Sequence, residues 1–214
     1  MLELNKLYLM DCMEGMKTFP DNYFDLAIVD PPYGIGIGEM NLGVGGGVAK
    51  HNNHIRKAWD NKIPEPHYFA ELQRISSNQI IWGANHYSLP PSAGWIVWQK
   101  MDIKNDYAPF ELAYTSLSKP RMFYFLWAGM WQGNMKDKEK RIHPTQKPVQ
   151  LYKWILYNYA KHDMKIIDTH VGSGSSIIAF LDYGCEWIGF EIDEDYHKAA
   201  SERIRIHQMQ LTIF

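Results

Sequence analysis

A stiff polar turn, Asp-Pro-Pro-Tyr-Gly at residues 30–34, carries the residue types in this chain that are best suited to chemistry. Prolines have a fixed φ and no N–H group, and Asp30 precedes one of them, so the backbone here is biased towards an extended form. The turn offers one carboxylate, carbonyl oxygens and the aromatic face of Tyr33. Acceptors beside an aromatic ring suit a planar ligand that bears an NH₂ group.

A second polar turn, residues 168–176, combines an aspartate with glycines (Asp-Thr-His-Val-Gly-Ser-Gly-Ser-Ser). Glycines let a ligand approach the backbone closely, and the free N–H groups at the start of a helix point into that space. A dinucleotide fingerprint would need a third glycine near Ile177, and a P-loop would need a lysine after Gly174. Neither is present, so the turn predicts a nucleoside site with little evidence for a pyrophosphate.

Two carboxylates narrow the nature of that nucleoside. Glu191 ends the next apolar run, where acidic side chains of nucleotide-binding α/β folds accept hydrogen bonds from ribose hydroxyls. Asp168 favours a ligand that is positively charged or bears an amine. A sulfonium nucleoside that carries an amino acid meets both demands.

The elements that must position these turns follow from apolar runs and helical spacing. Strands that alternate with helices predict a mostly parallel α/β sheet, with the last two of the middle strands antiparallel near its edge. Tryptophans within the strands are expected in the core: Trp82, Trp95, Trp98 and Trp127. The expected strands are 6–10, 24–29, 79–83, 94–100, 111–115, 121–127, 165–167 and 186–190, and the expected helices are 12–18, 66–75, 149–159, 177–181 and 195–207.

Composition sets outer limits on the class of protein. The 214 residues suit one globular domain, with 8 Trp, 13 Tyr and 9 Phe for its core. Cys12 and Cys185 have no paired spacing, which predicts neither a disulfide framework nor a metal site. No signal peptide or membrane-length apolar run is evident, so a cytoplasmic protein is expected. The net charge of −2 limits any nucleic-acid surface to a local patch.

Three motifs, in this order, resemble those of S-adenosylmethionine-dependent DNA methyltransferases that methylate exocyclic amines. They are Asp-Pro-Pro-Tyr at 30–33, His-Pro-Thr-Gln-Lys-Pro at 143–148 and Asp-x-x-x-Gly-Ser-Gly-Ser at 168–175. The catalytic motif precedes the cofactor motif, as in the circularly permuted β-group of these enzymes. The resemblance covers nearly the whole chain and implies a Rossmann-like methyltransferase fold.

The resemblance also implies residue roles. Two positions depart from the usual pattern: Val171 stands where the family usually has phenylalanine, and Gln146 where glutamate is more frequent. The implied catalytic residues are Asp30, Pro31, Pro32 and Tyr33. The implied residues of the S-adenosylmethionine site are Asp11, Cys12, Asp30, Pro144, Thr145, Lys147, Asp168, His170, Val171, Gly172, Ser173, Gly174, Ser175, Ser176, Glu191 and Ile192.

The implied chemistry agrees with the residues. The exocyclic amine of adenine is a poor nucleophile because its lone pair is delocalised into the ring. The Asp30 carboxylate and the Pro31 carbonyl can accept its two N–H groups as positive charge develops on nitrogen, which stabilises the transition state. Tyr33 would stack on a base flipped out of the duplex, because a stacked base cannot reach the site.

Few residues of the sequence are left for recognition of a target DNA sequence. The sequence predicts a single methyltransferase domain over 1–214, with a catalytic half at about 1–128, a cofactor half at about 143–214 and no separate recognition domain. The candidate DNA contacts are a glycine-rich loop at 34–56, a basic loop at 136–141, and, more weakly, Tyr107 and Trp131. A homodimer could supply further surface.

Other functions stay open from the sequence. Cytosine-N4 methylation presents a similar amine, although Asp rather than Ser before Pro-Pro leans towards adenine. Methylation of RNA or of a protein amide does not conflict with the near-neutral charge. A catalytically idle module that binds the cofactor for assembly is a different class, and the intact Asp30, Tyr33, Gly172 and Gly174 argue against it.

Overall fold

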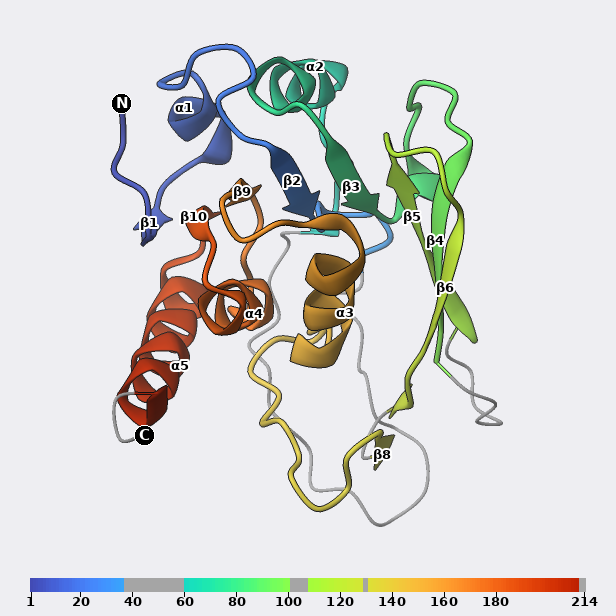
Figure 1. Cartoon of the computed structure of the whole chain (residues 1–214), viewed down its shortest axis with the longest axis vertical. Coiled ribbons are helices and arrows are strands. Elements are labelled where there is room, and N and C mark those ends of the chain that lie inside the picture. Colours follow the sequence, from blue (N-terminus) through green and yellow to red (C-terminus); the bar gives the residue numbers. More distant parts are fainter. Residues whose placement is uncertain (37–59, 101–107, 129–130, 212–214) are drawn as a thin grey trace.

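The protein, described here from a computed structural model, is built on an eight-stranded sheet (Figure 1). The structure describes residues 1–36, 60–100, 108–128 and 131–211. The strands are β1 (Lys6–Leu9), β2 (Leu26–Val29), β3 (Gln79–Trp82), β4 (Gly94–Gln99), β5 (Phe110–Thr115), β6 (Arg121–Tyr124), β9 (Lys165–Asp168) and β10 (Glu186–Glu191), and a separate small pair is formed by β7 (Trp127–Ala128) and β8 (Trp131–Gln132). The helices are α1 (Cys12–Met16), α2 (Pro66–Ile75), the 3₁₀ turn η3 (Ala84–His86), α3 (Val149–Tyr159), α4 (Ser175–Tyr183) and α5 (Glu194–Leu211).

The strand order is β1-β10-β9-β2-β3-β5-β4-β6. Every neighbouring pair is parallel except those made by β5, which is antiparallel to both β3 and β4. The prediction of a mostly parallel α/β sheet with an antiparallel part is therefore confirmed.

Three details near the β6 edge differ from the prediction. Strands β5 and β6 are not paired, because β5 already has β3 on one side and six residues of β4 on the other. Strand β6 lies instead beside β4, and it ends at Tyr124, before Trp127. Trp95 is 37% exposed, because alternate residues of β4 face opposite sides and its neighbours Gly94 and Ile96 take the buried side.

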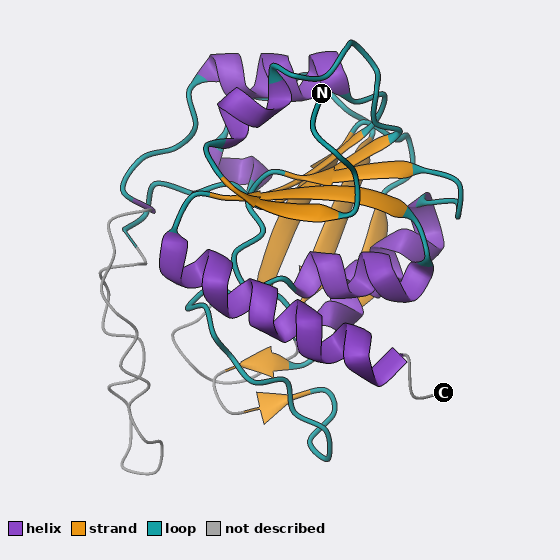
Figure 2. Ribbon diagram, turned by 90° about the vertical axis from the view of Figure 1, so that its left-hand side faces the viewer, coloured by secondary structure: helices purple, strands orange, loops and turns teal. Residues whose placement is uncertain are grey.

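Helices cover both faces of the sheet (Figure 2). Successive residues of β2 alternate between two cores: Leu26 and Ile28 pack on the side of α3, α4 and α5, while Ala27 and Val29 pack on the side of α1 and α2. Burial on both faces explains why β2 and β3 are apolar throughout rather than alternating. The sheet is thereby held rigidly at its centre, where the two polar turns emerge.

The centre of the sheet is also where the direction of the chain connections reverses. The chain passes from β2 through α2 on one face to β3, and from β9 through α4 on the other face to β10. Strands β2 and β9 are parallel neighbours, with Leu26 opposite Ile166 and Ala27 opposite Ile167. Ligands of open α/β sheets bind outside the carboxyl ends of strands at such a point, where Asp30 and Asp168 lie.

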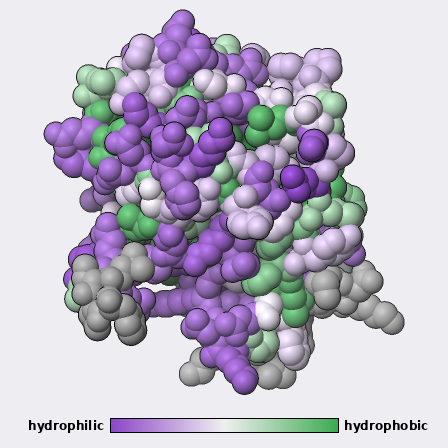
Figure 3. All heavy atoms as spheres, in the orientation of Figure 1, coloured by the Kyte–Doolittle hydropathy of each residue, from purple (hydrophilic) through white to green (hydrophobic). Residues whose placement is uncertain are grey.

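The surface shown in Figure 3 is mostly hydrophilic, with apolar side chains interspersed among the polar ones. Within the part of the chain that the structure describes, every helix is too short or too polar to cross a bilayer.

Candidate active site

The Asp-Pro-Pro-Tyr turn is fastened by side chains from other segments. Asp60 Oδ1 accepts hydrogen bonds from the backbone N–H groups of Tyr33 (2.7 Å) and Gly34 (3.1 Å). The Tyr87 hydroxyl donates to the carbonyl oxygens of Pro31 (2.7 Å) and Pro32 (2.9 Å). The turn is therefore held in one shape, as a site that must aim a carboxylate requires.

Both oxygens of the Asp30 carboxylate accept hydrogen bonds. The Tyr33 hydroxyl donates to Oδ1 at 2.7 Å, and Lys147 Nζ donates to Oδ2 at 2.6 Å. The side chain of Asp30 keeps 17% of its surface exposed, and a carboxylate has about four acceptor positions. Asp30 is thus fixed in direction and can still accept from a ligand amine.

The Tyr33 ring lies in a narrow slot. It stacks on the His86 ring at 5.1 Å with an interplanar angle of 13°, and the Lys147 ammonium lies 5.4 Å from its centroid. A Cβ on Gly83 would stand 2.2 Å from the ring, so only glycine fits there, and its φ of +71° also favours glycine. Tyr33 was predicted to stack on a flipped base; in this structure its partner is His86.

A chain of alternating charges continues from Asp30 into the protein. Lys147, which is 4% exposed, also forms an ion pair with Glu111 Oε2 at 3.0 Å. The other oxygen of Glu111 pairs with Lys100. Two carboxylates and two ammonium groups therefore alternate, and the chain carries no net charge.

Burial and the neighbouring charges set the protonation states of Asp30, Lys147 and Glu111. Burial raises the pKa of Asp30 and Glu111 repels its charge, while Lys147 acts in the opposite direction; the pKa remains above its usual value. Burial would lower the pKa of Lys147, but Asp30 and Glu111 outweigh it and raise that pKa. Burial opposes ionisation of Glu111 too, yet its two lysines lower its pKa to about 2. Lys147 and Glu111 are thus charged at neutral pH.

The second turn, residues 168–174, is called the glycine turn below. Asp168 at its start is 1% exposed and accepts hydrogen bonds from the Ser176 hydroxyl (2.5 Å) and the His170 backbone N–H (3.0 Å). Burial raises the pKa of Asp168 to about 7. No lysine or arginine among the described residues pairs with it, so a cationic ligand would supply its missing counter-charge.

Glu191 joins the end of β10 to the glycine turn. Its Oε2 accepts from the Gly172 N–H at 2.8 Å and its Oε1 from the Asp193 N–H at 2.9 Å. Gly172 has φ +54°, and among the described residues the atoms nearest to a Cβ there belong to the His143 ring, 3.8 Å away. A Cβ on Gly174 would instead touch Ala200 and Ile204 of α5 at 3.4 Å. Gly172 therefore borders open space, whereas Gly174 is a packing position.

The side chains of several predicted cofactor residues contact other parts of the protein. Val171 lies in the core at 5% exposure, and the hydroxyls of Ser173 and Ser175 bond to each other. Arg203 of α5 donates to the Ser173 carbonyl and to the Ser175 hydroxyl, both at 2.9 Å. Any contact that these residues make with a cofactor must therefore come from the backbone.

His170 is held with its neighbours by a short polar chain. Tyr68 and Thr169 share a hydrogen bond of 2.6 Å, and Thr169 and His170 share one of 2.9 Å. Burial lowers the pKa of His170 to about 4, so its ring is neutral at pH 7. This chain links α2 with the turn that follows β9.

Residues 143–148, the His-Pro segment, reach both turns. The His143 ring lies against Tyr196 at 4.3 Å and faces Gly172, while Lys147 reaches Asp30. Gln146 is 5% exposed and fixes the segment through Ile142 N–H, Lys140 O and the Trp127 indole. Pro144 and Thr145 are half-buried within it. Lys147 was predicted among the cofactor residues; the structure brings its ammonium to the carboxylate of Asp30, which was predicted as catalytic.

The remaining predicted residues lie at the β1 and β10 ends of the same edge. Asp11 caps α1 by accepting from the Met13 N–H at 2.7 Å, and it lies two residues beyond Leu9, which pairs with Glu191. Burial raises the pKa of the half-buried Cys12 to about 12, which keeps it a neutral thiol. Ile192 is 66% exposed, a large apolar surface available to a ligand.

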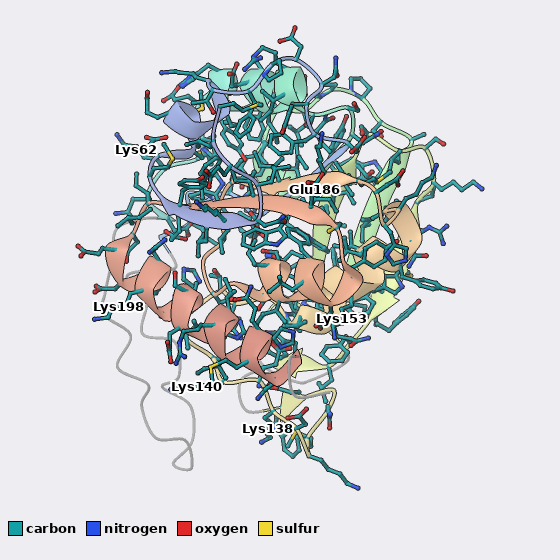
Figure 4. All side chains as sticks on the ribbon, turned by 60° about the vertical axis from the view of Figure 1, so that its left-hand side comes forward. Lys62, Lys138, Lys140, Lys153, Glu186 and Lys198 are labelled. Atoms are coloured by element: carbon teal, nitrogen blue, oxygen red, sulfur yellow. The ribbon has the colours of Figure 1, made fainter. Side chains whose placement is uncertain are left out.

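The basic loop, residues 136–141, turns its lysines outwards below α5 (Figure 4). Lys136, Lys138 and Lys140 are exposed, whereas Glu139 turns inwards to Arg203 at 2.7 Å. Arg141 stacks on Trp127 at 4.5 Å and is half-buried. Trp131 is 56% exposed. Tyr107 and nearly all of the 34–56 loop lie outside the described residues.

Sequence reasoning missed four residues that shape the site. Asp60, Tyr87, Lys100 and Glu111 all come from segments with no motif. Asp60, Tyr87 and Glu111 act through contacts with distant parts of the chain, and Lys100 acts through Glu111 on the neighbouring strand. Only Tyr87 had a local signal, since it follows a strand that ends in glycine. Within the described ranges, no three histidine, cysteine or acidic side chains gather as a metal site.

Comparison with known proteins agrees with this geometry. YubD of Escherichia coli (strain K12) is 27% identical over 212 residues, covering 91% of this chain and 87% of YubD. The Type II methyltransferase M.HinfI of Haemophilus influenzae is 24% identical over 249 residues, covering 94% of this chain and 68% of M.HinfI.

Solved structures share the fold. The M1.HpyAVI–SAM complex has a TM-score of 0.58 at 17% identity, covering 92% of this chain and 98% of that one. The cytosine-N4-specific PvuII DNA methyltransferase has the same TM-score at 12% identity, covering 96% and 91%. The family N6_N4_Mtase, described as DNA methylase, matches residues 50–202. The motif-based prediction is therefore confirmed: this chain belongs to the N6/N4 DNA methylase family.

Proposed function

We propose that the chain transfers a methyl group from S-adenosylmethionine to the N6 amine of adenine in duplex DNA, with the target base flipped into the site. One observation carries the proposal. The turn that bears Asp30 and the turn that bears Asp168 leave the ends of neighbouring parallel strands; the His-Pro segment contacts Asp30 through Lys147 and faces Gly172 through His143. An amine acceptor therefore lies beside a nucleoside site.

The residues of the glycine turn fit S-adenosylmethionine. Asp168 is a buried carboxylate without a basic side chain beside it in the described residues, which suits the ammonium of an amino acid. Gly172 leaves space next to the backbone, and Glu191 lies at the strand end where a ribose would be held. When bound, S-adenosylmethionine supplies a methyl group on a sulfonium sulfur, which makes that carbon electrophilic.

The chain's own residues act on the amine. The Asp30 carboxylate and the Pro31 carbonyl each accept an N–H of the target, and both are already fixed in direction by Tyr33, Lys147 and Tyr87. Acceptors that need no rearrangement stabilise positive charge as it develops on nitrogen. The Tyr33 ring, close to the same carboxylate, is the surface proposed for stacking with the base.

Adenine is favoured over cytosine by the aspartate that precedes Pro-Pro. The fold alone does not favour adenine, because a cytosine-N4-specific enzyme shares it at a TM-score of 0.58. The test is mass spectrometry of nucleosides from DNA treated with the purified protein and S-adenosylmethionine. N6-methyladenine is expected. Detection of N4-methylcytosine would show that cytosine is the target base. Cofactor binding without methylation of any nucleic acid would support a protein that binds the cofactor but does not catalyse methylation.

Cofactor affinity should depend on pH through Asp168. The pKa of this carboxyl is raised to about 7, and a cationic ligand binds its ionised form. Affinity is therefore expected to be full above about pH 7 and to fall about tenfold per pH unit below it. Calorimetry across this range measures the effect. In Asp168→Asn, affinity should be weak and the part of the slope due to Asp168 should vanish; an unchanged slope would contradict the assignment.

The basic loop should bind the DNA backbone. Replacing Lys136, Lys138 and Lys140 by alanine is expected to weaken binding equally for all sequences. The slope of log K against log salt should fall by about 3 if each lysine neutralises one phosphate. A salt titration measures it. The matched control removes three exposed lysines elsewhere (Lys6, Lys119 and Lys161), and an equal loss of slope there would rule out a specific role for the loop.

We also propose that residues 1–214 act as one methyltransferase domain, with the catalytic half at about 1–128 and the cofactor half at about 143–214. Pairing of β2 with β9 supports this, because it joins the two halves within one sheet. Sequence recognition would then come from loops, or from a homodimer, which sedimentation of the purified protein tests.

A further inference from the structure

We propose that Glu111 is a positioning residue for methyl transfer: paired with Lys100, it shares the Lys147 ammonium with Asp30 and so sets how strongly that carboxylate accepts the target amine. The inference rests on the proposed function. It assigns a role to residues of β5 and the end of β4 that carry no recognised motif.

The position of Lys147 makes this sharing possible. Its ammonium lies 2.6 Å from Asp30 Oδ2, 3.0 Å from Glu111 Oε2 and 2.9 Å from the Tyr33 hydroxyl. The ring of Trp82 lies 5.5 Å away on another side. Lys147 is 4% exposed and has little contact with water, so the two carboxylates are its main counter-charges.

Without Glu111, the whole attraction of Lys147 would fall on Asp30. A carboxylate bound tightly to one ammonium is a weaker acceptor for a second, neutral donor. Glu111 draws part of that attraction away, and Lys100 holds Glu111 ionised from its other side. Asp30 therefore stays both oriented by Lys147 and available to the amine.

The groups that face Asp30 come from several elements. Lys147 precedes α3 and lowers the pKa of Asp30, whereas Glu111 on β5 raises it. The remaining titratable groups around Asp30 are Tyr33 in the same turn, Tyr87 after η3, Tyr152 on α3 and Asp168 at the end of β9, with Lys100 beyond Glu111.

The charges of Lys147 and Glu111 have opposite signs, so their removal should shift the pKa of Asp30 in opposite directions. A merely structural role would not produce such opposite shifts. In Lys147→Met, Asp30 loses a cation, so the acid limb of the pH–kcat profile should move to higher pH. In Glu111→Gln, Asp30 loses a repelling anion and gains a larger share of Lys147, so the limb should move to lower pH. Misplacing a reacting group by about 1 Å costs about 100-fold in rate, and losses in plateau kcat up to that size are expected with KM for DNA little changed.

The experiment compares these two variants with Lys147→Met/Glu111→Gln, which keeps Asp30 and Lys100 as one charge of each sign. The double variant guards against misfolding of a single variant with an unbalanced buried charge, and its acid limb should lie between those of the singles. Matched controls are Lys153→Met, which breaks the pair with Asp182, and Glu71→Gln, which breaks the pair with Arg74. Neither control should move the limb.

A ¹³C titration of the Asp30 side-chain carboxyl, assigned by its loss in Asp30→Asn, follows the same shifts without catalysis. Opposite movement in the two singles, in both readouts, supports the inference. Rate losses with an unmoved limb would overturn it, and so would a shift by Glu111→Gln that is as large in the Lys147→Met background as in the wild type, because Glu111 is proposed to act through Lys147. If the wild-type protein methylates no DNA, the proposed function fails, and the carboxyl titration alone decides whether Glu111 and Lys147 oppose each other at Asp30.

Discussion

Replacing Asp30 by alanine is expected to reduce methyl transfer by at least about 100-fold, which is the usual effect of removing one preorganised partner of a developing charge. In the proposed reaction the carboxylate acts on the amine as it becomes positive, so its loss should appear in kcat rather than in cofactor affinity. Lys147 keeps its ion pair with Glu111 in this variant, which limits disturbance of the surrounding packing. Single-turnover methylation and calorimetry with S-adenosylmethionine measure the two quantities.

The matched control is Asp25→Ala. Asp25 lies just before the other end of β2, where its carboxylate accepts from the Lys165 backbone N–H at 2.8 Å. Removing it deletes a carboxylate next to the same strand without touching the site, so activity per folded molecule should persist. A rate close to that of the wild type in Asp30→Ala would show that the catalytic assignment is wrong.

The second large effect is expected at Gly172. An asparagine tolerates the left-handed backbone found there (φ +54°) and would place a side chain in the space beside the glycine turn. Crowding a fitted site costs about 1–3 kcal/mol, which corresponds to a loss of S-adenosylmethionine affinity of about 5- to 150-fold. Calorimetry on the folded variant measures it.

Gly184 provides the control for backbone strain. It ends α4 with φ +79°, and a Cβ there would meet nothing within 4 Å. Gly184→Asn should therefore bind the cofactor normally. If both variants lose affinity equally, the effect comes from destabilising α4 rather than from filling the site, and the cofactor must be sought elsewhere.

The order of the elements could be read from the sequence because each depends on neighbours along the chain. The apolar spacing of Tyr68, Phe69, Leu72 and Ile75 predicts α2, and all four are buried in the structure. The β5–β6 arrangement could not be read in the same way. Which strand lies beside β5 depends on the free edges left by β3 and β4, and a local pattern holds no information about them.

The site shows the same division. The Asp-Pro-Pro-Tyr turn and the glycine turn were predicted because short runs of residue types define both backbones. The contacts of Lys147 were not, because 117 residues separate it from Asp30 and nothing at either position specifies the partner. Glu111 was missed for a further reason: a charged residue in an apolar strand looks like a surface position until its buried partners are seen.

The four charges of the alternating chain, of which Lys147 is buried and the other three are half-buried, constrain how this sequence can change over generations. Losing a carboxylate partner of the buried Lys147 leaves its charge less well compensated, and about 3–5 kcal/mol, the cost of breaking a fully buried pair, is the upper bound of the loss. Replacing two oppositely charged members together avoids that cost. Replacing Lys147 together with Asp30 needs coincident mutations far apart in the gene, whereas Lys100 and Glu111 flank the one connection between β4 and β5 and can be replaced as a pair nearby. Positions 100 and 111 should therefore change together or not at all, although neither belongs to the Asp-Pro-Pro-Tyr motif.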